Sequence, residues 1–120
     1  MRQAGIIAAP GIIALTKMVD RLQEDHTMAQ LLGEGLRGIN RVRLLHPVQT
    51  NIIRMDVSGL KLNAEQFVTE TSKHGILTEA KGHNIIRFVT HRDITKEKVT
   101  YTIKCNKFWL SNFSRRYWIK

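Results

Sequence analysis

Cysteine and acidic residues are scarce in this sequence of 120 residues. The single cysteine, Cys105, excludes an intramolecular disulfide, and no Cys/His spacing resembles a zinc site, so we predict no metal site. Only 10 residues are acidic against 19 lysines and arginines, which gives a formal net charge of +9. A chain of this length forms one domain that is large enough to bury a core.

Aromatic residues are almost absent from the first 96 positions, which contain only Phe67 and Phe88 among a total of eight. The other six lie after Lys96, together with six basic residues and one acidic residue. Rings and cations mixed in this way are the ingredients of a surface that binds single-stranded nucleic acid or an anionic membrane. The composition therefore changes abruptly near Lys96, and the sequence predicts a junction there.

No membrane-spanning run is present in the sequence. The uncharged, mostly apolar run Ala4–Leu15 has 12 residues, whereas a spanning helix needs about 20. Charged sequence, TKMVDRLQED, follows where the small residues of a signal-peptide cleavage site would stand. The run is apolar on nearly every side, which predicts a helix enclosed by other protein, and Pro10 predicts a kink within it.

Hydrophobic spacing predicts a mixed fold for the rest of the chain. Apolar residues at three- and four-residue steps predict an amphipathic helix from Met18 to about Ile39. A capping box at Asn63 and Gln66 starts a second helix, which Gly75 ends. Four segments have the pattern of short strands: 41–47, 51–57, 75–80 and 84–90. We predict an α+β fold in which long N-terminal helices pack on a small, mostly antiparallel sheet.

One predicted strand carries an unusual charge. The segment NIIRFVTH places Arg87 between Ile85 and Val89 on one strand face, opposite Ile86 and Phe88. If that face is covered, the guanidinium needs an anionic partner, and its planar fork matches a carboxylate. If the face is solvated, Arg87 simply lies over it, and the residues alone leave both readings open.

Three motifs in this order, MRQAGIIAA, PVQTNI and IIRFVTHRDIT, resemble the C-terminal third of the low-specificity L-threonine aldolases. These are beta-eliminating lyases that use pyridoxal phosphate and have the aspartate-aminotransferase fold. The likeness covers residues 1–97 and implies the C-terminal small domain of a fold-type I enzyme. Residues 98–120 diverge as a basic aromatic tail that does not continue the family's amphipathic last helix. Because MRQAG is internal in the family, the resemblance implies that the chain is a fragment.

The resemblance also implies roles for four residues. Arg87 matches the arginine that binds the substrate α-carboxylate, and Arg2 matches an arginine that reaches the cofactor phosphate. Thr90 and His91 follow Arg87 in the motif and are expected to position Arg87 without contacting the substrate themselves. From the residues alone, His91 either orients a ligand or caps the turn after the strand. No catalytic residue is expected in this chain.

The implied parent reaction is cleavage of L-threonine or L-allo-threonine to glycine and acetaldehyde with pyridoxal 5'-phosphate. In the family the Schiff-base lysine lies upstream of MRQAG, so we expect no covalent cofactor here and no activity of this chain alone. Whether the chain is itself an enzyme therefore stays open. The resemblance implies a cytoplasmic homo-oligomer without a nucleic-acid partner. The alternative is a non-enzymatic binding module that uses the basic aromatic tail for nucleic acid or an anionic membrane.

Overall fold

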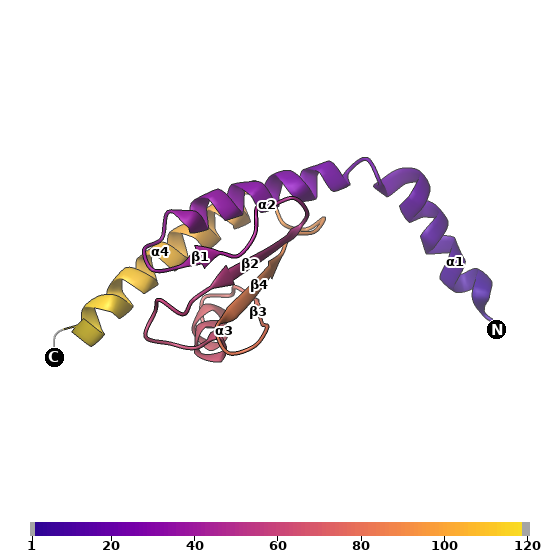
Figure 1. The fold of residues 1–120 in the computed structure, drawn as a ribbon. Coiled ribbons are helices and arrows are strands. Elements are labelled where there is room, and N and C mark those ends of the chain that lie inside the picture. Colours follow the sequence, from indigo (N-terminus) through magenta and orange to yellow (C-terminus); the bar gives the residue numbers. More distant parts are fainter. Residues whose placement is uncertain (1, 119–120) are drawn as a thin grey trace.

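Two long helices lie side by side over one face of a four-stranded antiparallel sheet (Figure 1). The structure is a computed structural model that describes residues 2–118. The helices of this layer are α2 (Leu22–Arg37), α3 (Ala64–Ser72) and α4 (Lys96–Trp118). The strands are β1 (Arg43–Leu44), β2 (Ile52–Asp56), β3 (Glu79–Ala80) and β4 (Ile85–Val89), in the spatial order β1-β2-β4-β3. The predicted α+β class is therefore confirmed.

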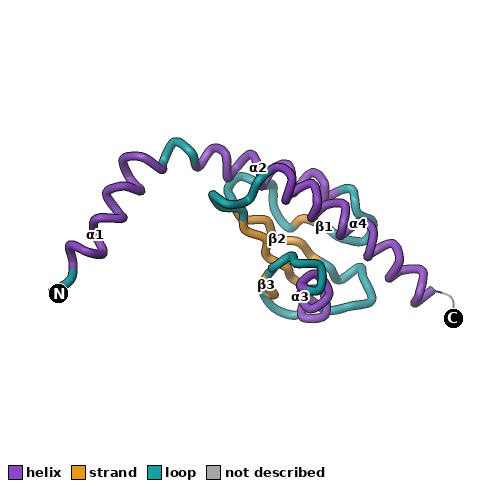
Figure 2. The backbone as a smooth tube through the Cα atoms, turned by 180° about the vertical axis from the view of Figure 1, so that it is seen from behind, coloured by secondary structure: helices purple, strands orange, loops and turns teal. Residues whose placement is uncertain are grey.

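The sheet is covered on one face only, as the alternating pattern of its two central strands predicts. On β2, Ile53 and Met55 are buried, and on β4 Ile86 and Phe88 are buried; all four belong to the hydrophobic core. Their neighbours along the strands point to the opposite face, which no helix covers in the described part of the chain (Figure 2). The architecture is two layers, helices on a sheet, with one open sheet face.

The start of α3 has the predicted capping box. The Asn63 side chain accepts a hydrogen bond from the Gln66 backbone N–H, and the Gln66 side chain accepts one from the Asn63 N–H, both at 2.9 Å. Two backbone donors that the helix cannot satisfy internally are thus paired. Leu62 and Phe67, on either side of the cap, are both buried. The cap fixes where the chain enters α3 and therefore how Phe67 reaches the core.

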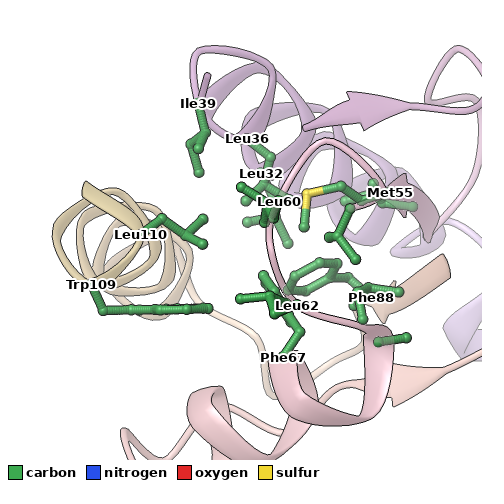
Figure 3. Close-up of a cluster of buried hydrophobic side chains, with 14 of the residues drawn as sticks. Leu32, Leu36, Ile39, Met55, Leu60, Leu62, Phe67, Phe88, Trp109 and Leu110 are labelled. Atoms are coloured by element: carbon green, nitrogen blue, oxygen red, sulfur yellow. The ribbon is translucent and has the colours of Figure 1, made fainter. Parts of the chain in front are cut away.

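Helix α4 corrects one expectation about the tail. The chain beyond Lys98 does continue an amphipathic helix, and α4 passes through this position without a break. Val99, Trp109 and Leu110 are buried, and Figure 3 shows Trp109 and Leu110 together with the core side chains of α2 and α3. The Trp109 ring centroid is 5.2 Å from that of Phe67. The composition disguises this helix because charged residues fill its outer face while single apolar residues recur on the inner one.

The apolar N-terminal segment is helical and exposed within this chain. Helix α1 (Ala4–Ile13) runs on through Pro10 and continues as the π-helical turn η1 (Ala14–Met18), so the break before α2 lies at residues 19–21. No residue of α1 or η1 is buried within this chain, and enclosure by other protein stays a prediction. The segment projects away from the sheet (Figures 1 and 2). Between residues 2 and 118, no helix combines the length and apolar character that crossing a bilayer requires.

Candidate functional site

Arg87 lies near the middle of β4 and points to the open face of the sheet. Its side chain is 30% exposed, so the stem lies over the sheet while the guanidinium reaches solvent. The Arg87 Nη1 donates a hydrogen bond to Glu79 Oε2 at 2.9 Å. Glu79 is the register partner of Arg87 on the edge strand β3. The two readings of this strand are therefore both partly right: the face is open, and the guanidinium has a carboxylate partner.

Glu79 is shared between two cations. Its second carboxylate oxygen is ion-paired with the Lys81 ammonium, which follows β3. Hydrogen bonds from Lys81 and, secondly, from Arg87 hold the pKa of Glu79 below its ordinary value of 4.5. The carboxylate consequently stays ionised at neutral pH and holds one edge of the Arg87 fork. The guanidinium has five N–H donors, so the edge away from Glu79 can bind a second carboxylate.

Thr90 follows Arg87 and is a buried tie between two layers. Its hydroxyl donates a hydrogen bond to the Asp25 backbone carbonyl in α2 at 2.6 Å. The Asn51 side-chain amide donates to the Thr90 carbonyl, and the Thr90 N–H donates to the Asn51 carbonyl, both at 2.9 Å. The end of β4 is thus attached to the start of β2 and to α2. Thr90 fixes the strand that carries Arg87 and does not itself face the open surface.

His91 lies in the turn between β4 and α4, with its side chain exposed. Its Nδ1 accepts a long hydrogen bond from the Asp93 N–H at 3.4 Å, and its carbonyl accepts one from the Ile94 N–H at 2.8 Å. Thr90 and His91 also line a hollow of about 380 Å³ together with residues of α4, and Arg87 is not among its lining residues. The turn-capping reading of His91 fits these contacts better than ligand orientation.

Arg2 lies just before α1, at the end of the segment that projects from the sheet. The residue is exposed. Arg87, Thr90 and His91 therefore lie within one short segment of the chain, and Arg2 lies apart from this segment. Within residues 2–118, no three His, Cys, Asp or Glu side chains are grouped so that they could hold a metal ion.

Sequence reasoning missed Glu79 and Arg54 as neighbours of Arg87. Arg54 on β2 is the register partner of Arg87 on the side away from β3. The alternation of β2 does place Arg54 on the open face, but the pairing between strands decides which residue it meets. Arg54 lies on a strand that is distant in sequence, so no local pattern reports its pairing with Arg87. Glu79 lies across the hairpin turn of residues 81–84, whose length is the signal that could have indicated this register.

Comparison with known proteins gives a consistent family assignment. Residues 1–59 match the family model described as Beta-eliminating lyase. Over 107 residues the chain is 38% identical to low-specificity L-threonine aldolase 1 of Arabidopsis thaliana, covering 88% of this chain and 30% of that protein. It is 38% identical over 104 residues to the low specificity L-threonine aldolase of Escherichia coli K12, covering 82% and 28%. The chain thus spans less than a third of the length of these relatives.

Solved structures support the fold. One is a complex between the cystine C-S lyase C-DES and its product cysteine persulfide; it has a TM-score of 0.65 and 16% identity, and covers 92% of this chain and 28% of that one. A mutant of C-DES with glycine covalently linked to its PLP cofactor gives a TM-score of 0.62 at 17% identity, covering 79% and 23%. The arrangement described above therefore occurs as part of a larger enzyme fold.

Proposed function

Because the chain belongs to the beta-eliminating lyase family, we propose that it is the part of a pyridoxal-phosphate-dependent L-threonine aldolase that holds the substrate carboxylate. The reaction of the complete enzyme is cleavage of L-threonine or L-allo-threonine to glycine and acetaldehyde. Residues 1–97 correspond to its C-terminal small domain, and residues 98–120 form a divergent continuation. In this proposal the complete enzyme is a cytoplasmic homo-oligomer, as the resemblance of the three motifs implies.

The observation that carries the proposal is the position of Arg87. Its guanidinium lies on the open face of the sheet, already makes one carboxylate contact at 2.9 Å, and keeps N–H donors for another. A bidentate guanidinium contact orients a carboxylate as well as binding it. In this proposal Arg87 fixes the orientation of the amino acid by its α-carboxylate, while Thr90 and His91 hold the end of β4 in place.

The chain does not build a cofactor site alone. Pyridoxal phosphate supplies an electron sink for bond cleavage next to an amino group, and it needs a lysine, a partner for its ring nitrogen and a phosphate contact. Lys81, which follows the edge strand beside Arg87, is ion-paired with Glu79. Arg2, the proposed phosphate contact, lies at the start of the projecting segment. We propose that the chain alone does not hold the cofactor and is inactive, because the resemblance places the Schiff-base lysine upstream of MRQAG.

The aromatic residues of α4 give less support to the alternative of a non-enzymatic binding module. Trp109 and Phe113 would have to stack on bases or enter a membrane, but Trp109 is buried and its ring lies 6.2 Å from that of Phe113. The Trp109 indole N–H donates to the Asn106 side chain at 3.0 Å. Both rings thus belong to the packing of α4, whereas Tyr101 and Phe108 are exposed, and the side chains of Tyr117 and Trp118 lie outside the described residues. The binding module therefore stays the second candidate.

A chimeric enzyme tests the proposed function. The matched segment of Arabidopsis thaliana L-threonine aldolase 1 is replaced by this chain, and acetaldehyde release from L-threonine and L-allo-threonine is measured with added pyridoxal phosphate. We expect the chimera to be active and Arg87→Ala to lower its kcat/KM roughly tenfold to hundredfold, with a raised KM, because a charged hydrogen-bond partner is lost.

The matched control is Arg37→Ala, which removes an arginine that is ion-paired with Glu34 on the exposed side of α2. This variant is expected to keep the kinetics of the parent chimera. An Arg87→Ala chimera with unchanged KM and kcat would contradict the assigned role of Arg87. Acetaldehyde release by the unmodified chain alone would contradict its dependence on a further domain.

A further inference from the structure

Two arginines lie directly opposite each other on the open face of the sheet. Arg54 on β2 and Arg87 on β4 are register partners. Backbone hydrogen bonds join the pair Asn51/Thr90 three positions to one side of Arg54/Arg87 and the pair Val57/Asn84 three positions to the other side. Hydrogen-bonded and non-hydrogen-bonded pairs alternate along an antiparallel ladder, so Arg54 and Arg87 form a non-hydrogen-bonded pair. In such a non-hydrogen-bonded pair the side chains are closest, with Cβ atoms about 4.5 to 5.5 Å apart.

The charges in this row do not balance. Glu79 lies on the far side of Arg87 and is shared with Lys81, so one carboxylate serves two cations. No described residue forms an ion pair or hydrogen bond with the Arg54 guanidinium. Like charges directly opposite each other on neighbouring strands destabilise a sheet. An anion between the two guanidinium groups would remove this repulsion.

The other carboxylate on this face is already engaged. Asp56, two residues after Arg54, accepts hydrogen bonds from the Ser58 N–H at 2.8 Å and from Arg43 at 3.1 Å. It is therefore not the partner of Arg54. The contact between Glu79 and Arg87 shows in addition that this surface orients a carboxylate against the Arg87 fork. The unmatched charge thus lies beside a guanidinium that already holds one carboxylate.

We propose that Arg54 and Arg87 together form a two-guanidinium site for one carboxylate group. This inference deepens the proposed function and rests on it, since the carboxylate is the α-carboxylate of the amino-acid substrate. Arg87 approaches it from β4 and Arg54 from β2, so that the ligand lies across the two central strands. Arg54 is a second carboxylate-binding residue, and Glu79 holds Arg87 from the opposite side.

An NMR titration of the 120-residue chain tests the site. The side-chain Nε–Hε resonance of Arg87 is followed while sodium acetate replaces sodium chloride at constant ionic strength. We expect a saturable shift, and Arg54→Gln should weaken acetate binding about threefold because one of two favourable charge contacts is lost. Arg43→Gln is the matched control, since Arg43 lies on the same face but is paired with Asp56, and it should leave the affinity unchanged.

The outcomes separate this inference from the proposed function. Equal weakening by Arg54→Gln and Arg43→Gln would show a general charge effect and overturn the two-guanidinium site. An Arg54→Gln chain that binds acetate like the unmodified chain would overturn it too, while leaving Arg87 as a carboxylate-binding residue. A shift of Arg87 that never saturates would overturn both. Backbone amide spectra of each variant verify that the sheet is intact.

Discussion

Asp56 is one of the sheet side chains whose ionisation affects stability. Its Oδ1 accepts a hydrogen bond from the Ser58 backbone N–H at 2.8 Å, and its Oδ2 pairs with Arg43 at 3.1 Å. The hydrogen bond from Ser58 is the largest cause that lowers the pKa of Asp56 below 3.8, and Arg43 adds to it. Because the pKa of Asp56 is lower in the folded state than in the unfolded state, its ionised form stabilises the fold at pH values above the unfolded-state pKa. This stabilisation is lost as the pH falls through the folded-state pKa.

We therefore predict that Asp56→Asn lowers the free energy of unfolding at neutral pH by about 1 kcal/mol. The difference from the unmodified chain should begin to shrink below about pH 4, where unfolded Asp56 becomes protonated, and should vanish only below the lowered pKa of folded Asp56, where both proteins carry a neutral side chain. Urea unfolding from pH 7 to pH 2 measures it. Asp20→Asn is the control, since Asp20 is exposed in the turn before α2. A difference that stays constant down to pH 2 would argue against ionisation as the cause.

The candidate site shows which residue properties a sequence reports. The face of Arg87 follows from the alternation of NIIRFVTH, and its need for an anionic partner follows from its charge; Glu79 meets that need. The hairpin turn between β3 and β4 could have indicated this partner, but it was not used to set the register. Arg54 could not be predicted, because its strand pairs with β4 over a long separation in sequence. The roles of Arg87 and Arg2 in a complete enzyme stay predictions.

At the level of elements, local chemistry predicted starts and ends well. The cap of α3, the positive φ of 74° at Gly75 and the buried stripe of α2 all follow from a few neighbouring residues. The packing of α4 did not follow, because it depends on what the rest of the chain places beside this helix. Composition predicted a junction near Lys96, whereas α4 begins there and carries core residues.

Helix α4 offers a direct comparison of two neighbouring aromatic residues. Trp109 is 6% exposed and packs on Phe67, while Phe108 is 69% exposed. We predict that Trp109→Ala lowers the free energy of unfolding by about 3 to 5 kcal/mol, because a large ring leaves a cavity. Phe108→Ala should change it by less than about 0.5 kcal/mol. Chemical unfolding followed by far-UV circular dichroism gives both values, and similar losses in the two variants would contradict the packing of α4 described above.

The whole molecule is elongated, with principal extents of 63, 29 and 25 Å, because α1 and η1 project from the core. They expose several large apolar side chains: Ile6, Ile7, Ile12, Ile13 and Leu15. Exposed apolar surface of this kind promotes association. Since these residues contribute no buried side chain, the core does not depend on them.

Deleting residues 2–17 should therefore leave the melting temperature within about 2 °C of the full chain, because no buried contact is lost. The same deletion should reduce concentration-dependent light scattering. Differential scanning calorimetry and static light scattering measure the two effects on one sample. A large fall in melting temperature would mean that the segment packs on the core in solution, and unchanged scattering would assign association to another surface.

The position of Leu110 and Trp109 in the core has a consequence for biosynthesis. They are buried with residues of α2 as distant in sequence as Ala29. Loops that join such distant segments close late, and a growing chain cannot make these contacts before its last helix has left the ribosome. Until then, α3 can cover part of the sheet, but the side chains of α2 that pack on α4 stay exposed. The core of these residues is therefore completed only after residue 110 has emerged.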